Sequence, residues 1–408
     1  MDGLIIGLDL CDSYTRICCH DREKSWSIPT VVCRKKEEAD SWYVGEEAYA
    51  YTLAGEGIIV DKLLKLTAKE GTATLGGTKY EALELLKIFL KKILEIPKKE
   101  YFREDVRQLV ITLQKMDAKL LDGLMYCADY LNIPRDRVHI VSHTESFVYY
   151  VLNQKKEIWN NQVAAFDLSE DGLFYHELKV QRGLKKMTVI ADEEALEESF
   201  NLDVLDNASG MKLADKIMCS CGERLLDRKL FSTIFLTGKG FERQDWAGNF
   251  MKLICPRRKV FVEQELFARG AAFRGGDLLQ ERSASSFVCI CSGRLHSTIS
   301  MKVLYKERES QLVVAAAGDS WYESKSTVDL ILDGQDYVEF IVTPMDPKQR
   351  KVVRIPLEGF PDRPDRTTRV GLNVGFLDEK TMAVVLRDKG FGELFPSSGT
   401  VVRREVRI

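Results

Sequence analysis

The chain has 408 residues, of which 45% are hydrophobic and 30% are charged. This length predicts two or three domains, and the composition excludes an intrinsically disordered chain. The formal net charge of −3, from 59 basic and 62 acidic residues, favours neither a nucleic acid nor a membrane as partner. Since no apolar run approaches the ~18 residues of a membrane span and the start lacks a signal-peptide pattern, we expect the cytoplasm.

The ten cysteines lie mostly in apolar runs, which is typical of buried free thiols in a reducing compartment. Two Cys-x-Cys pairs, Cys219/Cys221 and Cys289/Cys291, have the ligands for a four-thiolate zinc site. The pairs lie about seventy residues apart, and Cys289 and Cys291 alternate along a predicted strand, where they simply share a face. We therefore do not expect zinc at these cysteines.

The first part of the chain alternates strand-like and helix-like segments, which predicts an α/β lobe over residues 1–158. The predicted strands are 4–10, 14–20, 27–33, 109–113 and 139–142, and the predicted helices are 80–96, 117–131 and 145–152. Pro97 is expected to end the first of these helices, because proline lacks the N–H that the helix needs.

The same pattern then restarts and predicts a second lobe over residues 159–278. Strands are expected at 163–168, 173–181 and 233–236, and helical stretches at 192–230, 244–254 and 263–273. After about residue 280 the chain changes to short alternating segments separated by turn signals. We therefore predict one two-lobed domain over 1–278 and a β-sandwich over 286–408.

Three strand ends carry the most specific pattern in the sequence. Asp9 and Asp167 each lie near the end of a strand before a polar turn, and a third strand leads into Gly238-x-Gly240. This order resembles the superfamily of actin, sugar kinases and Hsp70. Segments 7–10, 28–32, 44–48, 267–272 and 355–378 further resemble Hsp70, so the resemblance covers nearly the whole chain. It indicates a reduced bacterial branch that ends at Ile408 without the helical lid.

The resemblance implies a two-lobed actin-type (ribonuclease H-like) domain that binds ATP or ADP with Mg²⁺, followed by a sandwich like the Hsp70 substrate-binding domain. Asp9 and Asp167 would hold water around Mg²⁺, Glu145 would position the attacking water, and Lys62 would contact phosphate, so the implied catalytic residues are Glu145, Asp9 and Lys62. The implied nucleotide-binding residues are Asp9, Cys11, Asp12, Ser13, Tyr14, Asp167, Ser169, Gly172, Gly238, Lys239 and Gly240.

Each of these residues also has a purely structural interpretation. A strand-end aspartate can cap local amides, and Glu145 can be a solvated acid in the first turn of a helix. Lys62 can be a surface lysine, and the glycines at 238 and 240 can serve only the geometry of a strand-to-helix connection. The two interpretations remain open at this point.

The two phosphate turns depart from the family pattern. The first has Cys11-Asp12-Ser13 where Gly-Thr-Thr is expected, and the second has residues 169–172, Ser-Glu-Asp-Gly, where Gly-Gly-Gly-Thr is expected. Like charges about 5 Å apart repel by roughly 3 kcal/mol at an effective dielectric of 20. Because Asp12, Glu170 and Asp171 would face an anionic ligand, we expect weak or absent ATP hydrolysis.

Two classes of function follow. The protein is either a non-hydrolysing, chaperone-like or scaffold protein with the Hsp70 shape, or an active ATP-hydrolysing chaperone. A filament-forming actin relative fits less well, because actin relatives carry no such sandwich. The charged loops 307–310 and 346–350 are expected to protect strand edges, so the sandwich should dock one unidentified protein partner and bind unfolded peptides weakly. A structural cap on the first domain is the alternative.

Overall fold

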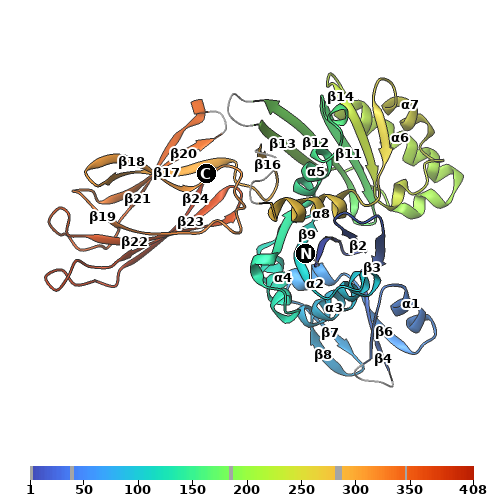
Figure 1. Ribbon diagram of the computed structural model, residues 1–408, viewed down its shortest axis with the longest axis horizontal. Helices are drawn as coiled ribbons and strands as arrows, with labels where there is room; N and C mark the ends of the chain where they lie inside the picture. Colours follow the sequence, from blue (N-terminus) through green and yellow to red (C-terminus); the bar gives the residue numbers. More distant parts are fainter. Residues whose placement is uncertain (1–2, 37–40, 183–186, 281–286, 345–346) are drawn as a thin grey trace. The chain divides into compact units, whose positions relative to one another are not determined.

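The computed structural model describes residues 3–36, 41–182, 187–280, 287–344 and 347–408. It is a mixed α/β structure with several sheets, and it divides into two units, Met1–Phe287 and Val288–Ile408 (Figure 1). Residue 286, the predicted start of the second domain, and Asp346 of the charged loop lie outside the described residues. Among the helices of the described segments, none is long and apolar enough to cross a membrane.

The first sheet of unit 1 has five strands in the order β10-β9-β1-β2-β3. Their bounds are β1 Leu4–Leu10, β2 Tyr14–Cys19, β3 Ser25–Pro29, β9 Val106–Leu113 and β10 Val138–Ser142. The central strand β1 pairs in parallel with β9 and antiparallel with β2. Its side chains are almost all buried, as expected for a strand covered on both faces, which explains why it is a continuous apolar run in the sequence.

The second sheet of unit 1 repeats this arrangement along β15-β14-β11-β12-β13. Their bounds are β11 Gln162–Ser169, β12 Gly172–Arg182, β13 Met187–Ala195, β14 Phe231–Thr237 and β15 Lys259–Val262. The central strand β11 again pairs in parallel with one neighbour, β14, and antiparallel with the other, β12. Asp9 on β1 and Asp167 on β11 therefore lie near the carboxyl ends of equivalent strands.

Helices α5 and α8 lie between the two sheets (Figure 1). The bounds are α2 Leu63–Ala68, α3 Ala82–Tyr101, α4 Ala118–Tyr130, α5 His143–Leu152, α6 Ala208–Leu226, α7 Gly248–Ile254 and α8 Leu266–Leu278. The short 3-10 helices are η1 Arg135–Arg137, η2 Lys156–Ile158, η3 Leu202–Asp206, η4 Lys239–Phe241 and η5 Pro347–Gln349. The core under α6 and α7 is aromatic, with Phe166, Phe241 and Phe250 fully buried.

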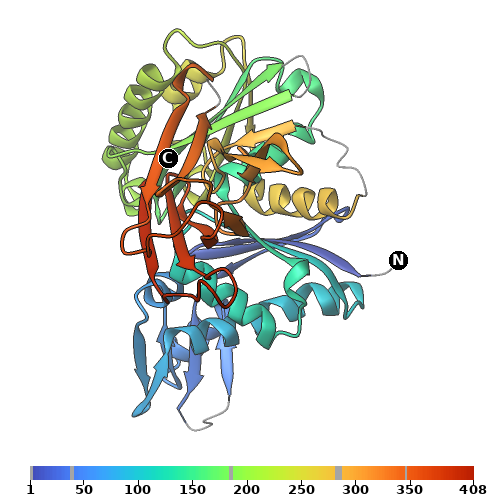
Figure 2. The same cartoon turned by 90° about the vertical axis from the view of Figure 1, so that its left-hand side faces the viewer.

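A small subdomain extends unit 1 at one end, where its blue strands are visible in Figure 2. It contains a three-stranded sheet β5-β4-β6, helix α1 and the hairpin β7-β8. The bounds are β4 Val32–Lys35, β5 Trp42–Val44, α1 Glu46–Leu53, β6 Gly57–Val60, β7 Thr72–Leu75 and β8 Thr78–Glu81. Val31, Cys33 and Ala48 form its small core.

Two predictions of element boundaries are wrong. Helix α3 does not end at Pro97 but continues to Tyr101, and Phe102 closes it in the left-handed conformation at φ 51°. Pro97 is buried on the apolar face of this helix, so packing offsets the lost hydrogen bond. Residues 192–195, predicted to be helical, instead complete strand β13, because pairing with β12 decides their conformation.

Helix α8 packs with unusually close backbone approaches. A Cβ atom on Gly270 would lie 1.9 Å from the carbonyl oxygen of Ser146 in α5, and one on Gly7 would lie 2.1 Å from that of Ala268 in α8. Only glycine permits such contacts. These glycines therefore let α8 touch both α5 and strand β1, which fixes the elements that carry the site.

Unit 2 has two four-stranded antiparallel sheets, β18-β17-β20-β21 and β19-β22-β23-β24, after β16 Phe287–Ile290 at the division. The bounds are β17 Ser297–Tyr305, β18 Arg308–Ala315, β19 Ser326–Ile331, β20 Tyr337–Pro344, β21 Lys351–Pro356, β22 Arg369–Asp378, β23 Thr381–Asp388 and β24 Val401–Arg407. Alternate residues of both sheets, such as Phe340 and Leu372, share one hydrophobic core. The alternation in the sequence thus reflects strands with one buried face.

A buried ion pair lies at the end of β23. Asp388 accepts two hydrogen bonds of 2.8 Å from Arg363, and also accepts the backbone N–H groups of Gly390 and Ser398. Burial alone would raise the pKa of Asp388, but the hydrogen bonds from Arg363 and Ser398 outweigh it and hold the pKa far below its ordinary value.

We predict that Asp388→Asn lowers the free energy of unfolding of unit 2 by about 3 kcal/mol, because it leaves the Arg363 charge buried without its partner. The exposed pair of Lys389 and Asp329 supplies the control, and Asp329→Asn should cost less than about 1 kcal/mol. Chemical denaturation of the full chain measures both. Because the folded pKa is depressed, the difference between wild type and Asp388→Asn is full above about pH 4 and shrinks as the pH falls. Equal effects of the two variants would contradict the prediction.

Candidate functional site

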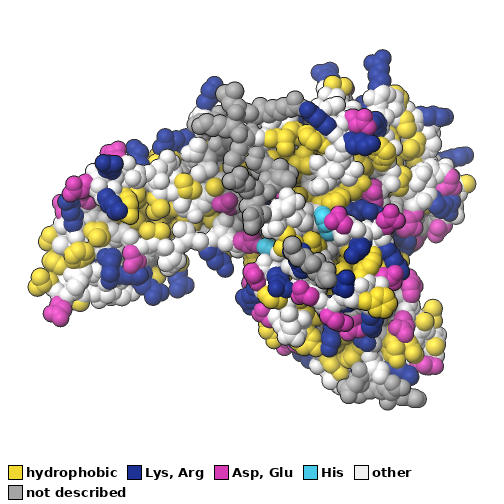
Figure 3. All heavy atoms as spheres, in the orientation of Figure 1, with side chains coloured by type: hydrophobic (Ala, Val, Ile, Leu, Met, Phe, Trp, Pro, Cys, Tyr) yellow, Lys and Arg dark blue, Asp and Glu magenta, His cyan; other side chains and the backbone are white. Residues whose placement is uncertain are grey.

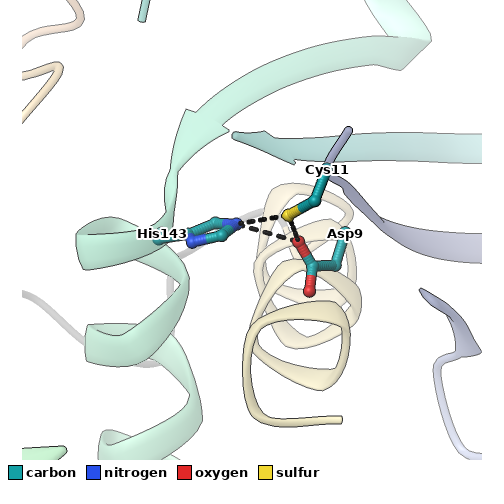
Figure 4. Close-up of side chains that lie close together, drawn as sticks. All are labelled: Asp9, Cys11 and His143. Carbon is teal, nitrogen blue, oxygen red and sulfur yellow. Dashed lines mark hydrogen bonds and ion pairs between the residues drawn. The ribbon is translucent and has the colours of Figure 1, made fainter. Parts of the chain in front are cut away.

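Asp9, Cys11 and His143 meet at the carboxyl edge of the first sheet (Figure 4). His143 Nε2 lies 2.8 Å from Asp9 Oδ1, and Cys11 Sγ lies 3.4 Å from the same oxygen and 3.8 Å from Nε2. Asp9 lies near the end of β1, Cys11 directly follows that strand, and His143 is the first residue of α5, directly after β10. The carboxyl ends of parallel strands meet at one edge, so the topology itself assembles this group.

The Asp9–His143 pair is an ion pair buried from solvent. Burial raises the pKa of Asp9, but the charge and hydrogen bond of His143 outweigh it, so the pKa is lowered. Burial lowers the pKa of His143, but Asp9 outweighs it, so the pKa is raised. Both shifts favour the charged forms. The pKa of the Cys11 thiol is raised by burial and by the neighbouring Asp9, Asp171 and Asp167, so Cys11 carries its proton.

Asp167 lies close enough to this group for the charges of Asp9 and His143 to affect it. Burial raises the pKa of Asp167 to about 7, a shift that His143 opposes and Asp9 reinforces. The third turn packs directly on this carboxyl: a Cβ on Gly238, whose φ is 88°, would lie 2.4 Å from Asp167 Oδ1. Gly240 is equally close to the Leu168 side chain. Both glycines are thus required by packing of the turn on β11.

Further buried polar side chains lie near His143, on strands β12 and β13. Glu193 on β13 accepts hydrogen bonds from Gln114 at 2.7 Å and from Thr144 at 3.1 Å. His176 on β12 is fully buried, with Nδ1 3.6 Å from Glu193, and neither ring nitrogen has a hydrogen-bond partner among the described residues. Burial and the charge of His143 lower the pKa of His176 to about 3, so it is neutral. Such a concentration of buried ionisable groups is typical of functional sites.

The two predicted phosphate turns contact each other. Asp171 of the second turn accepts a hydrogen bond of 2.8 Å from the Ser13 hydroxyl and one of 3.3 Å from the Ser13 N–H. Lys65 of α2 lies 3.6 Å from Asp171 and 3.5 Å from Asp12. Asp12 in turn accepts the N–H groups of Leu64 and Lys65 at the start of α2. The Asp171 carboxylate therefore occupies the Ser13 donors of the first turn.

The other acid of the second turn is also paired. Glu170 forms an ion pair with Lys239 of the third turn, and the Lys239 ammonium lies 5.1 Å from the centre of the Tyr14 ring. Lys239 of the third turn thus contacts both Glu170 of the second turn and Tyr14, which directly follows the first turn. Ser169 and Gly172 pair with each other across the second hairpin.

Two of the predicted catalytic residues lie apart from this group. Glu145 is buried, but it faces Arg274 of α8 at 3.6 Å, and the same arginine donates to Tyr149 and Asp277. Lys62 is exposed at the N-terminal end of α2, in the left-handed conformation. The side chains that face Asp9 and Asp171 are instead His143, two residues before Glu145, and Lys65, one turn after Lys62.

Sequence reasoning therefore missed His143 and Lys65. A signal for His143 was present, because it directly follows the predicted strand 139–142, which is β10 of the sheet that carries Asp9. Ser142 caps α5 by accepting the Glu145 N–H, which fixes where the helix begins and which residue faces the edge. Lys65 carried no comparable signal.

Mg²⁺ binds oxygen ligands at about 2.0–2.1 Å with nearly octahedral geometry. The donors next to Asp9 are an imidazole nitrogen and a thiol sulfur, and Arg16 lies 3.9 Å from its other oxygen. This donor set does not fit Mg²⁺.

We predict that Gly238→Ala lowers the free energy of unfolding of unit 1 by about 2 kcal/mol, because the new Cβ meets backbone and carboxyl atoms at a positive φ. Gly248→Ala is the matched control: Gly248 begins α7, and its Cβ would meet no atom within 4 Å. Thermal unfolding of both full-length variants measures the difference. A Gly238→Ala variant as stable as Gly248→Ala would show that the close packing on Asp167 is not required.

Comparison with known proteins gives matches to two families. The C-terminal part of the family of unknown function DUF5716 matches residues 13–292, and the domain of unknown function DUF8552 matches residues 294–408. No curated protein matches the chain. The first match spans most of the chain and includes Ser13, His143, Asp167 and the third turn, whereas Asp9, Cys11 and Asp12 precede it. The chain therefore belongs to the DUF5716 family.

Proposed function

We propose that the protein is an Hsp70-like scaffold or chaperone-like protein that does not efficiently hydrolyse ATP. In this proposal unit 1 is a two-lobed actin-type domain, and unit 2 is a β-sandwich of the Hsp70 type. The repeated sheet order in unit 1 supports the first part, together with the equivalent positions of Asp9 and Asp167. The shared core of two four-stranded sheets supports the second.

The observation that carries the proposal is the position of Asp171. In a phosphate-binding turn, the backbone N–H and hydroxyl groups donate to phosphate oxygens. Here the Ser13 N–H and hydroxyl donate to the Asp171 carboxylate, with Lys65 beside it. Asp171 thus occupies the donors as a phosphate oxygen would. A nucleotide has to displace a carboxylate that is already covalently attached to the protein, and that competition weakens binding.

The environment of Glu145 supports the absence of hydrolysis. A residue that positions an attacking water must present its carboxylate toward the phosphates. Glu145 instead faces Arg274, and it is 2% exposed. ATP or ADP remains the predicted ligand, and Mg²⁺ would enter with its phosphates near Asp167. These residues support nucleotide binding of low affinity more than turnover.

A protein partner at the β-sandwich remains part of the proposal. Basic and acidic side chains are interspersed over the faces of both units that Figure 3 shows, which does not favour a nucleic acid. Leu304 and Tyr305 at the end of β17 and Leu394 are exposed in unit 2, and each offers apolar contact area. Strand β24, an edge strand, carries Arg403 and Arg404, which discourages addition of an unfolded peptide strand. One defined partner is therefore favoured over general client peptides.

We predict that calorimetric titration of ATP with Mg²⁺ gives weak binding to the wild type and about tenfold tighter binding to Asp171→Ala, because the variant frees the Ser13 donors. Asp136→Ala is the matched control, since Asp136 is an exposed aspartate of η1, away from the turns, and it should leave the affinity unchanged.

The same preparations test hydrolysis. We expect turnover well below about 1 per second in the wild type and in Asp171→Ala. A faster rate that Glu145→Ala abolishes would overturn the proposal and favour an active ATP-hydrolysing chaperone. ATP affinity that is high in the wild type and unchanged in Asp171→Ala would show that Asp171 does not compete with the nucleotide.

A further inference from the structure

We propose that Asp9, Cys11 and His143 bind a divalent transition-metal ion of the Zn²⁺ class, with one coordination position open to water. The three ligand atoms are Asp9 Oδ1, Cys11 Sγ and His143 Nε2, and all lie within 4.8 Å of one another (Figure 4). The inference does not depend on the proposed function, because it requires no nucleotide.

The separations of the three atoms match a common metal centre. Zn²⁺ binds oxygen and nitrogen at about 2.0–2.2 Å and sulfur at about 2.3 Å, so tetrahedral ligands lie roughly 3.3–3.8 Å apart. The observed separations are 3.8 Å for sulfur to nitrogen, 3.4 Å for sulfur to oxygen and 2.8 Å for nitrogen to oxygen. Only the nitrogen-to-oxygen distance is shorter than this range. An ion bound between Asp9 and His143 would lengthen it.

The chemistry of the donors selects the kind of ion. Thiolate and imidazole suit Zn²⁺, Co²⁺ and related metals, whereas Mg²⁺ and Ca²⁺ require oxygen ligands. The set here combines sulfur, nitrogen and oxygen, each supplied once. It therefore fits a borderline-soft metal, in contrast to the Mg²⁺ that the sequence predicts for Asp9.

The ligands are held on rigid elements, as a preorganised site requires. Asp9 lies inside the central strand β1, where Arg16 lies 3.9 Å from Oδ2, on the side away from the group. The His143 ring stacks on Phe267 of α8, with centroids 4.1 Å apart and planes 9° from parallel. Asp9 and His143 are buried, and Cys11 is half-buried, so the sulfur is the member of the group through which an ion would enter.

Charge and proton balance are satisfied. When the ion binds, the S–H bond of Cys11 breaks, a metal–sulfur bond forms and the proton passes to solvent. His143 likewise loses its Nε2 proton to solvent and coordinates through that nitrogen. The thiolate and the Asp9 carboxylate then neutralise the two positive charges of the ion. Three protein ligands leave a fourth tetrahedral position, which is characteristic of sites that hold a water or an external ligand.

The test uses the full-length, metal-free protein and Co²⁺ alone, without nucleotide. We expect one equivalent of Co²⁺ to produce a thiolate-to-cobalt charge-transfer band and the visible bands of a tetrahedral complex, and one equivalent of Zn²⁺ to displace them. Because this measurement uses the wild-type chain, it does not depend on whether any variant folds.

Variants then assign the site. Cys11→Ser should abolish the charge-transfer band, and His143→Gln should weaken Co²⁺ affinity by at least tenfold. Cys255→Ser is the matched control, since Cys255 is the exposed cysteine among the described residues and the one most open to adventitious metal. It should leave the spectrum unchanged, and circular dichroism should show each variant folded.

Absence of the charge-transfer band in the wild type would overturn the proposal, as would a band that persists in Cys11→Ser or disappears in Cys255→Ser. Failure of the proposed function gives a different result, because it appears as ATP turnover or tight ATP binding in experiments without Co²⁺. Metal binding with no nucleotide binding, or the reverse, therefore separates the two ideas.

Discussion

The close crossing of α5 and α8 is the constraint on which the site depends. Gly270 removes the Cβ that would collide with the Ser146 carbonyl, so the two helices touch at their backbones. That contact places Phe267 of α8 against the ring of His143 in α5, and the stacked ring is held toward Asp9. Gly7 brings α8 equally close to the strand that carries Asp9. A larger side chain at either glycine would separate the elements that hold the buried ion pair.

Charge compensation explains how so many acids remain in one region of the fold. A buried charge is tolerated when an opposite charge or several hydrogen-bond donors satisfy it. Buried Asp9 has His143, half-buried Asp171 has Ser13 and Lys65, and the exposed Glu170 pairs with Lys239. From the sequence alone, Asp12, Glu170 and Asp171 were expected to face an anionic ligand as unpaired charges. In the folded chain each of these acids instead has a partner within the protein: Lys65 for Asp12, Ser13 for Asp171 and Lys239 for Glu170.

The broad organisation could be predicted because it rests on local periodicity. Apolar runs marked the buried strands of unit 1, helical spacing marked α3 and α4, and alternation marked the half-buried strands of unit 2. The errors occurred where tertiary contacts override local preference. Pro97 remains inside α3 because its helix face is buried, and residues 192–195 join β13 because β12 offers them hydrogen bonds. Neither contact can be recognised from a short stretch of sequence.

At the site, local signals in the sequence were enough to predict that Asp9 and Asp167 lie near the ends of equivalent strands and that glycines follow the third strand. These signals did not determine which side chains meet there. His143 joins Asp9 and Cys11 across more than 130 residues, and Lys65 joins Asp171 across about a hundred. These partners depend on the tertiary fold, because pairing of parallel strands and the crossing of α5 with α8 bring distant residues to one edge.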